Sequence, residues 1–261
     1  MSSRLRLASF LTLTVGSNLA FSPLRSPILH TTSCAAFSSN TGGNGNGKVS
    51  DLRKEYSRQG INEEDCPLDP YDLFKVWFDE ACNAKVIEPN AMCLSTSSKD
   101  GYPSARYVLL KAHDERGFVW YTNFNSRKGG ELIENPRAAL TFWWGDLERS
   151  IRIEGDVEKV SEEESTAYFH SRPRGSQIGA WSSNQSSPIA NREALAQQEK
   201  EVIARFDQVD PIPKPPHWGG FRLIPSRIEF WKGRESRLHD RIVYTKTGKE
   251  GTKWTASRVQ P

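Results

Sequence analysis

The chain has 261 residues with 36% hydrophobic content, eight tryptophans and twelve phenylalanines, which is ample for the packed core of one large domain or two small ones. The formal net charge is +3, but the first fifty residues hold four basic and no acidic residues, so the rest carries 31 basic against 32 acidic residues. This near-neutral balance argues against a nucleic-acid-binding surface and favours a small anionic ligand held by local basic clusters.

The first fifty residues have the composition of a targeting segment. A basic start, MSSRLR, precedes the apolar run LASFLTLTVGS, which is too short to span a membrane in the mature protein. An acid-free stretch rich in Ser and Thr follows, with Phe21 directly after a candidate cleavage point behind Ala20. This order resembles the two-part presequence of a plastid bounded by extra membranes, with a mitochondrial presequence as the alternative. Residues 38–47 are expected to form a flexible linker, so we divide the chain into residues 1–50 and 51–261.

From residue 51 onward the sequence predicts many strands and few helices. Asp69-Pro70 favours a helix start, since apolar residues follow at helical spacing from Leu73 to Ala81. Ser161 and Glu164 form a capping box that predicts a helix through Tyr168, and a polar helix is expected over 191–207. Strands are predicted at 91–98, 105–112, 118–123, 138–144, 150–160, 221–231, 241–248 and 252–259. Consecutive strands with helices at the margins predict a mainly β fold, an antiparallel barrel with peripheral α-helices.

Several common site types have no signature in this chain. Neither G-x-G-x-x-G nor a Walker loop occurs, so a nucleotide here is not expected in a dinucleotide-binding fold or a P-loop. The four cysteines form no C-x-x-C pair and have no histidines at zinc spacing, which predicts reduced thiols and no metal site.

Four clusters combine cations with hydroxyls and aromatic rings: RYVLLK at 106–111, YTNFNSRKGG at 121–130, YFHSRPRGSQIGAWSSNQS at 168–186, and RLHDR at 237–241 with Trp231 ahead of it. In the second cluster, Ser126 is expected to cap a helix whose first N–H groups and basic residues face an anion. In the third, Tyr168 and Arg172 lie one helical turn apart, Pro173 ends the helix, and Ser176 is placed in the turn beyond. These features predict two phosphate sites, one for a cofactor and one for a substrate.

For the first and fourth clusters, the predictions rest on the alternation of side chains along a strand. Arg106 and Lys111 are five residues apart, so a regular strand would turn them to opposite faces. Arg237, His239 and Arg241 alternate, so a strand would point all three the same way. The second pattern predicts an anion pocket with an ionisable imidazole at its centre, although a charged surface strand has the same pattern.

Read in series, these motifs resemble pyridoxamine 5′-phosphate oxidase. The resemblance covers residues 51–261 and rests on RKEY at 53–56, RYVLLK, YTN with SRK, YFHSRPRGSQIGAW, NQSS, WGGFR, IEFW and RLHDR. It implies a homodimer of split antiparallel β-barrels with FMN at the subunit interface. It also implies a vitamin B6 activity, in which pyridoxamine or pyridoxine 5′-phosphate is oxidised to pyridoxal 5′-phosphate while O2 becomes H2O2. No metal, nucleic acid or membrane is implied for the mature protein.

The resemblance also implies roles for individual residues. FMN would be held by Arg106, Tyr107, Val108, Leu109, Leu110, Lys111, Tyr121, Thr122, Arg127, Lys128, Ser150, Gln185, Ser186, Trp231 and Arg241. The substrate would meet Lys111, Tyr168, Arg172, Ser176, Arg237, Leu238 and His239, with Arg53, Lys54, Glu55 and Tyr56 as a lid. Arg237 and His239 would be the catalytic pair, since a planar guanidinium stacks on the substrate ring and an imidazole hydrogen-bonds its substituents.

One position departs from the family pattern. Ser150 stands in RSI where the family has RQV with a flavin-contacting Gln, and the missing neutral hydrogen bond is worth about 1 kcal/mol. Two rival functions are kept open. A flavin reductase would have no need of the Tyr168, Arg172 and Ser176 cluster, and a pyridoxal phosphate carrier would have no need of Arg237 and His239. A nucleic-acid-binding function is the most distant alternative.

Overall fold

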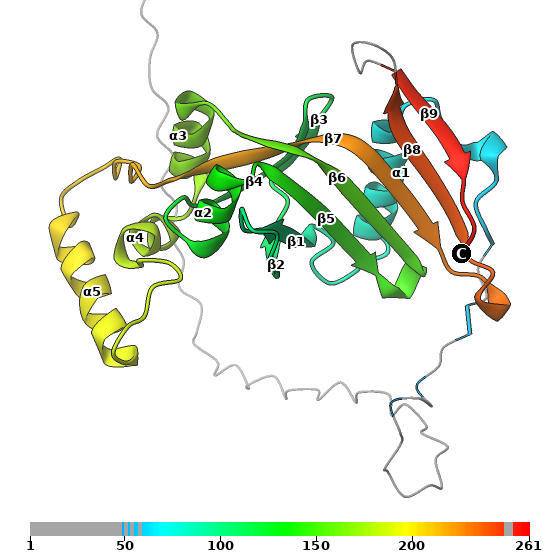
Figure 1. Ribbon diagram of the computed structural model, residues 1–261. Helices are drawn as coiled ribbons and strands as arrows, with labels where there is room; N and C mark the ends of the chain where they lie inside the picture. Colours follow the sequence, from blue (N-terminus) through cyan, green and yellow to red (C-terminus); the bar gives the residue numbers. More distant parts are fainter. Residues whose placement is uncertain (1–48, 50–51, 53–54, 57–58, 248–252) are drawn as a thin grey trace, which may run out of the picture. The chain divides into compact units, whose positions relative to one another are not determined.

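The computed structural model describes residues 49, 52, 55–56, 59–247 and 253–261. The predicted presequence and linker lie outside these residues apart from Val49, as do Arg53 and Lys54 of the predicted lid. Residues 53–261 form one compact unit, shown in Figure 1. No helix in the described part of this unit is long and apolar enough to cross a membrane.

An antiparallel sheet of nine strands is the centre of the unit (Figure 1). The strands are β1 (Ala91–Ser97), β2 (Pro103–Leu109), β3 (Ala112–Asp114), β4 (Gly117–Asn123), β5 (Arg137–Trp144), β6 (Arg149–Lys159), β7 (Trp218–Lys232), β8 (Asp240–Thr247) and β9 (Lys253–Arg258). Their order is β2-β1-β5-β6-β7-β4-β3, with β8 on β7 and β9 on β8. The predicted mainly β fold, a curled antiparallel sheet with helices around it, is confirmed.

Strand β7 organises the sheet because its 15 residues pair with three neighbours. Its first half pairs with β4 and its second half with β8, while β6 runs along both. The register of β6 and β7 shifts between Glu154 and Gly155, opposite Pro225, as expected where proline interrupts a ladder. A Cβ at Gly155 would lie 2.0 Å from the carbonyl oxygen of Ile224, so only glycine fits this bulge.

Five α-helices surround the described part of the sheet: α1 (Pro70–Asn83), α2 (Arg127–Glu134), α3 (Glu162–Ser171), α4 (Arg174–Ser182) and α5 (Arg192–Arg205). Their starts follow the predicted caps. Asp69 accepts from the N–H of Tyr71, and Ser161 accepts from the N–H of Glu164. Short 3₁₀ turns occupy Glu63–Asp65, Gly145–Leu147 and Glu235–Arg237.

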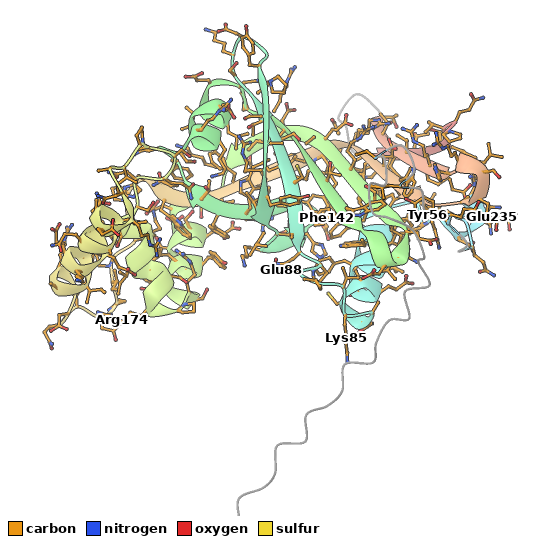
Figure 2. All side chains as sticks on the ribbon, turned by 90° about the horizontal axis from the view of Figure 1, so that it is seen from below. Tyr56, Lys85, Glu88, Phe142, Arg174 and Glu235 are labelled. Atoms are coloured by element: carbon orange, nitrogen blue, oxygen red, sulfur yellow. The ribbon has the colours of Figure 1, made fainter. Side chains whose placement is uncertain are left out.

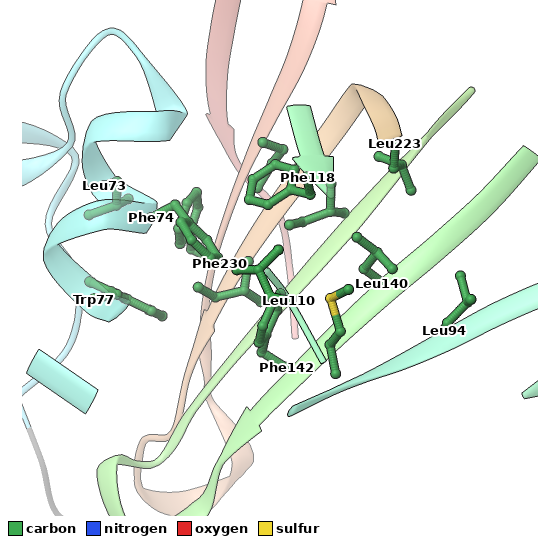
Figure 3. Packing of buried hydrophobic residues seen from close by; sticks show 14 of the residues in the cluster. Leu73, Phe74, Trp77, Leu94, Leu110, Phe118, Leu140, Phe142, Leu223 and Phe230 are labelled. Carbon is green, nitrogen blue, oxygen red and sulfur yellow. The ribbon is translucent and has the colours of Figure 1, made fainter. Parts of the chain in front are cut away.

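The main core lies between α1 and the concave face of the sheet (Figure 3). Phe74 contacts Phe118 and Phe142 with ring centroids 4.9 and 5.5 Å apart, and Trp77 contacts Phe230 at 5.3 Å. These rings are buried, so α1 is held by the apolar spacing that predicted it.

Three local predictions are wrong. Residues 112–114 form the short strand β3, which pairs with β4, whereas the sequence predicted one continuous strand over 105–112 and none at 113–114. Pro173 ends α3 as expected, but Arg174 starts α4 at once, so Ser176 lies in a helix rather than a turn. Proline is compatible with a helix start because its missing N–H is not needed there.

The third error concerns RLHDR. Strand β8 begins only at Asp240, and Arg237 belongs to a 3₁₀ turn in which Ser236 and Arg237 have φ of 55° and 63°. Left-handed backbone breaks strand alternation, so Arg237, His239 and Arg241 do not share a strand face.

Candidate active site

A cavity of about 660 Å³ lies where the ends of β2 and β4 meet α2, α3 and α4. We call it the phosphate cavity. It is lined by Arg106, Tyr107, Val108, Leu109, Lys111, Tyr121, Thr122, Asn123, Lys128, Tyr168, Arg172, Pro173, Ser176, Gly179, Ala180, Ser183, Gln185 and Trp218. Three of the four predicted clusters therefore meet here. Four of the lining residues are cations and none is Asp or Glu, which fits an anionic ligand.

Arg106 and Lys111 line the same cavity, contrary to the alternation expected for them. The reason is that β2 ends at Leu109, so the two side chains do not belong to one regular strand. Tyr107, which also lines the cavity, is 80% exposed, while Leu110, just beyond the end of β2, is in the core rather than in the cavity.

A buried carboxylate organises Arg106. Glu131 accepts from the hydroxyls of Thr96 and Ser104 at 2.5 and 2.7 Å, and from Nη2 of Arg106 at 3.3 Å. Burial opposes the charge of Glu131. The hydrogen bonds from Thr96, Ser104 and Arg127, together with the nearby charge of Arg106, nevertheless lower the pKa of Glu131 to about 2. Nε of Arg127 donates to Oε1 of Glu131 at 2.9 Å, and Arg127 does not line the cavity.

Lys128 provides the second cation at the Arg106 end of the cavity. Its Nζ donates to Oγ1 of Thr122 at 3.1 Å and to Oε1 of Gln185 at 2.8 Å. Burial and the nearby charge of Arg106 lower the pKa of Lys128 to about 8. Its hydrogen-bond partners are neutral, so a bound phosphate would supply the missing negative charge.

Helix α2, which contains Lys128, starts where the sequence predicted. Ser126 caps α2 by accepting from the N–H of Gly129 at 3.3 Å. The predicted neighbour Ser186 has a left-handed φ of 71° and does not line the cavity, whereas Gln185 does.

Tyr168, Arg172 and Ser176 form the other end of the cavity. Tyr168 stacks on Tyr121 with ring centroids 3.9 Å apart. The guanidinium of Arg172 lies over Trp218 at 4.7 Å, and its Nη1 is buried with no hydrogen-bond partner in the structure. A guanidinium nitrogen without a hydrogen-bond partner, at an end of the cavity that also carries the hydroxyl-bearing residues Tyr168 and Ser176, fits a phosphate oxygen. Trp218 was missed by the site prediction, although its WGGFR motif had been noticed.

The remaining predicted residues gather elsewhere, around the end of β7. Ser150 and Trp231 line a separate cavity of about 430 Å³ with Thr141, Trp143, Arg152 and Glu229. Glu229 accepts from Nε of Arg241 at 2.8 Å. Burial opposes its charge, but bonds and charges from Arg241, Arg152 and Arg227 lower the pKa of Glu229. The hydroxyl of Ser150 donates to the carbonyl oxygen of Phe142 at 2.9 Å, so its proton is used within the sheet.

Trp231 connects this second cavity to the RLHDR loop. His239 lies against Trp231 with ring centroids 4.7 Å apart, and Tyr56 contacts both rings edge-on at 5.6 and 5.5 Å. Arg237 and Leu238 are exposed on this loop, and Glu55 is exposed beside Tyr56. Asp240, at the start of β8, forms an ion pair with Arg258 of the neighbouring strand β9.

One chain does not bring the two groups together. The two cavities share no lining residue. In Figure 2, Arg174 of α4 lies at one end of the unit, and Tyr56 and Glu235 lie at the other. In the described residues no cluster of His, Cys, Asp and Glu could hold a metal ion.

Comparisons with known proteins agree on one family. Residues 78–206 match the family model described as pyridoxamine 5′-phosphate oxidase, and residues 218–261 match that of the pyridoxine 5′-phosphate oxidase C-terminal dimerisation region. The chain is 54% identical over 213 residues to pyridoxine/pyridoxamine 5′-phosphate oxidase of Trichormus variabilis, covering 82% of this chain and 98% of the relative. It is 57% identical to the Bordetella avium protein of the same name, covering 82% and 99%.

Solved structures show the same fold. PhzG from Burkholderia lata, in complex with tetrahydrophenazine-1-carboxylic acid, has a TM-score of 0.71 and 33% identity, over 76% of this chain and 95% of that one. A pyridoxamine 5′-phosphate oxidase-related, FMN-binding protein from Nostoc punctiforme has a TM-score of 0.58 and 15% identity, over 75% and 100%. The fold is thus the split barrel that the resemblance implied.

The predicted plastid location, with its mitochondrial alternative, is contradicted. The relatives are bacterial proteins from cyanobacteria, Bordetella and Burkholderia, and they point to a bacterial protein rather than an organellar one. The error has a physical reason: a basic, acid-free, Ser- and Thr-rich composition is shared by leaders of several kinds and by plain polar tails, so it does not encode a destination.

Proposed function

The chain belongs to the pyridoxamine 5′-phosphate oxidase family, and we propose that it oxidises pyridoxamine or pyridoxine 5′-phosphate to pyridoxal 5′-phosphate with FMN as cofactor and O2 as acceptor. Pyridoxamine phosphate, O2 and water give pyridoxal phosphate, ammonia and H2O2; pyridoxine phosphate and O2 give pyridoxal phosphate and H2O2. The observation that carries the proposal is one cavity with four cations, no carboxylate and two separate groups of phosphate donors.

The cofactor side would use the donors around Lys128. Arg106, Thr122, Lys128 and Gln185 fit a phosphate, because they present a guanidinium, an ammonium and neutral polar groups without a carboxylate in the lining. FMN, when bound, supplies the two-electron chemistry, while the protein supplies position and electrostatics. Glu131 keeps Arg106 in place from behind.

The substrate side would use Tyr168, Arg172 and Ser176 for the phosphate, with Lys111 at the same cavity. Holding the phosphate fixes the distance from the ring to the cofactor, which is catalysis by positioning. Arg237 would cover the ring, and His239 would donate a hydrogen bond to a ring substituent. Tyr56, which contacts His239 and Trp231, would close the site as part of the lid.

The separation of the two groups supports a homodimer with shared sites. In this arrangement the phosphate cavity of one protomer meets Ser150, Trp231, Arg237, His239 and Arg241 of its partner. The match of residues 218–261 to a dimerisation region supports the same assembly.

The proposal is tested with purified protein and added FMN. Pyridoxamine 5′-phosphate is added without oxygen, and the visible spectrum is recorded. We expect the flavin absorbance to bleach and then to return in air, with equal amounts of pyridoxal phosphate and H2O2. A flavin that stays oxidised with pyridoxamine phosphate and pyridoxine phosphate, but is reduced by an unphosphorylated compound or a nicotinamide, would overturn the proposal.

A further inference from the structure

Arg172 differs from three other arginines of the unit in how its charge is held. Arg106 pairs with Glu131, Arg222 with Glu164, and Arg241 with Glu229. Arg172 has no acidic partner among the described residues, and its Nη1 is buried without a hydrogen bond. A guanidinium in this state needs another source of stabilisation, since burial alone lowers its pKa from the usual value.

The indole of Trp218 supplies that stabilisation. Its ring lies 4.7 Å from the guanidinium carbon of Arg172, within the range of a cation–π contact, and Phe169 adds a weaker contact at 5.7 Å. Trp218 is itself fixed, with 6% of its surface exposed and its backbone paired with Asn123 at the start of β7. The position of Arg172 is therefore set by the sheet as well as by α3.

Trp218 also contacts both tyrosines of the cavity. Its ring is nearly parallel to that of Tyr121, at 5.4 Å and 13°, and to that of Tyr168, at 6.2 Å and 8°. One side chain thus orders Tyr121 on the proposed cofactor side and Tyr168 and Arg172 on the proposed substrate side.

The nature of the contact matters for an anionic ligand. A carboxylate would hold Arg172 by cancelling its charge, and a phosphate would then have to compete with it. An aromatic face attracts the cation through its quadrupole and carries no net charge, so the full positive charge stays available to the ligand.

We propose that Trp218 is a specificity-determining residue, which makes the site prefer phosphorylated substrates by holding Arg172 in place as an uncompensated cation. The proposal deepens the function proposed above and rests on it for the identity of the substrate. Trp218 is a positioning residue, acting through Arg172 and Tyr168.

The test compares Trp218→Leu and Trp218→Phe with the wild-type FMN-loaded protein, using pyridoxamine 5′-phosphate and pyridoxamine as substrates. For Trp218→Leu we expect KM for the phosphorylated substrate to rise about tenfold, which corresponds to about 1.4 kcal/mol. The ratio of kcat/KM for the phosphorylated substrate to kcat/KM for unphosphorylated pyridoxamine should therefore fall about tenfold in this variant. Trp218→Phe keeps an aromatic face of weaker quadrupole, so its KM should rise only about threefold.

A matched control is available on β9. Trp254 also lies under a cation, Lys246 at 5.4 Å, but lines neither of the two site cavities. Trp254→Leu should leave unchanged the ratio of kcat/KM for pyridoxamine 5′-phosphate to kcat/KM for pyridoxamine. If Trp218→Leu does not give a soluble flavoprotein, the expected threefold rise of KM in Trp218→Phe is the measurement that tests the proposal.

A binding measurement separates this inference from the oxidase proposal. Inorganic phosphate is titrated into the FMN-loaded wild type and variants, and its Kd is measured by equilibrium dialysis. Weaker phosphate binding in Trp218→Leu supports the role of Trp218 even if wild-type protein does not oxidise pyridoxamine phosphate. An unchanged phosphate Kd with unchanged KM, or an equal loss for both substrates, would overturn it.

Discussion

The backbone N–H of Arg234 donates a hydrogen bond to Nδ1 of His239 at 3.1 Å. Because Nδ1 accepts this bond, the proton of the neutral imidazole lies on Nε2. The ring is further held between Trp231 and Tyr56. His239 is therefore oriented to offer an N–H at Nε2, which under the proposed function would donate to the substrate ring.

This orientation predicts unequal effects of two amide substitutions. The amide nitrogen of Gln reaches the position of Nε2, whereas that of Asn reaches only the position of Nδ1. We expect His239→Gln to keep kcat/KM within about twofold and His239→Asn to lose about fivefold, since a lost hydrogen bond is worth about 1 kcal/mol. Steady-state kinetics with pyridoxamine phosphate measures both. Equal losses in the two variants would mean that the Nε2 donor has no role.

Lys128 predicts a pH dependence of cofactor binding. Burial and Arg106 lower its pKa to about 8 in the cofactor-free protein, so the amine loses its charge as pH rises through that value. A phosphate binds the charged form, so FMN affinity should fall above about pH 8 in the wild type. Fluorescence titration of FMN between pH 7 and 10 checks this, with Lys128→Met as the control. The variant should bind FMN more weakly at pH 7 and lack the decline.

The same lowered pKa has a consequence for stability. In the unfolded chain the amine keeps its proton up to about pH 10.5, so between pH 8 and 10.5 the unfolded state binds more protons than the cofactor-free folded state. The contribution of Lys128 to the free energy of unfolding should therefore increase with pH across this window. In thermal melts without FMN, Lys128→Met should be more stable than wild type below about pH 8, and the difference should shrink above it.

Ser150 predicts a gain of cofactor affinity on substitution. Its hydroxyl already donates to the carbonyl of Phe142, so it offers no proton to the cavity beside Trp231. Ser150→Gln would add an amide where the family has one, and we expect FMN to bind about fivefold more tightly, in line with about 1 kcal/mol for one hydrogen bond. Ser150→Ala is the matched control: its FMN Kd should stay within about twofold of wild type. Weaker binding in Ser150→Ala would show that Ser150 contacts the flavin directly.

Local sequence signals predicted most of the fold. The caps at Asp69, Ser126 and Ser161 and the apolar spacing of α1 act over a few residues, and each lies where it was expected. The failures are positions where two local rules compete. Pro173 ends one helix and starts the next, and the left-handed turn at Ser236 and Arg237 has no glycine to signal it.

The site was less accessible to local reasoning because its contacts are long-range. Trp218 comes to lie under Arg172 through the packing of α3 against β7, and nothing in the spacing of 46 positions along the chain reveals this contact. Likewise, the motifs gave one list of ligand residues, while the folded chain divides them between the phosphate cavity and the region around the end of β7 and the RLHDR loop. A list of motif residues holds no information on which protomer supplies each one.

This division predicts that two inactive variants restore one another. Arg172→Ala removes a phosphate donor from the phosphate cavity, and Arg237→Ala removes the guanidinium of the loop at the other end of the chain. Each homodimer should be nearly inactive while retaining FMN. A mixed dimer, however, contains one site that combines an intact Arg172 from one protomer with an intact Arg237 from the other.

Co-expression of the two variants with different affinity tags, followed by purification through both tags, isolates the mixed dimer. With one intact site of two, it should show about half of the wild-type kcat per dimer at an unchanged KM. If both residues acted in a site within a single chain, each site of the mixed dimer would carry one substitution and the mixture would stay inactive. The reciprocal control, a double variant mixed with wild type, separates the two cases further. If the two protomers share each site, every site of this mixed dimer contains one of the two substitutions, and the dimer should be nearly inactive. If each site lies within one chain, the wild-type protomer keeps an intact site, and the dimer should have about half of the wild-type activity.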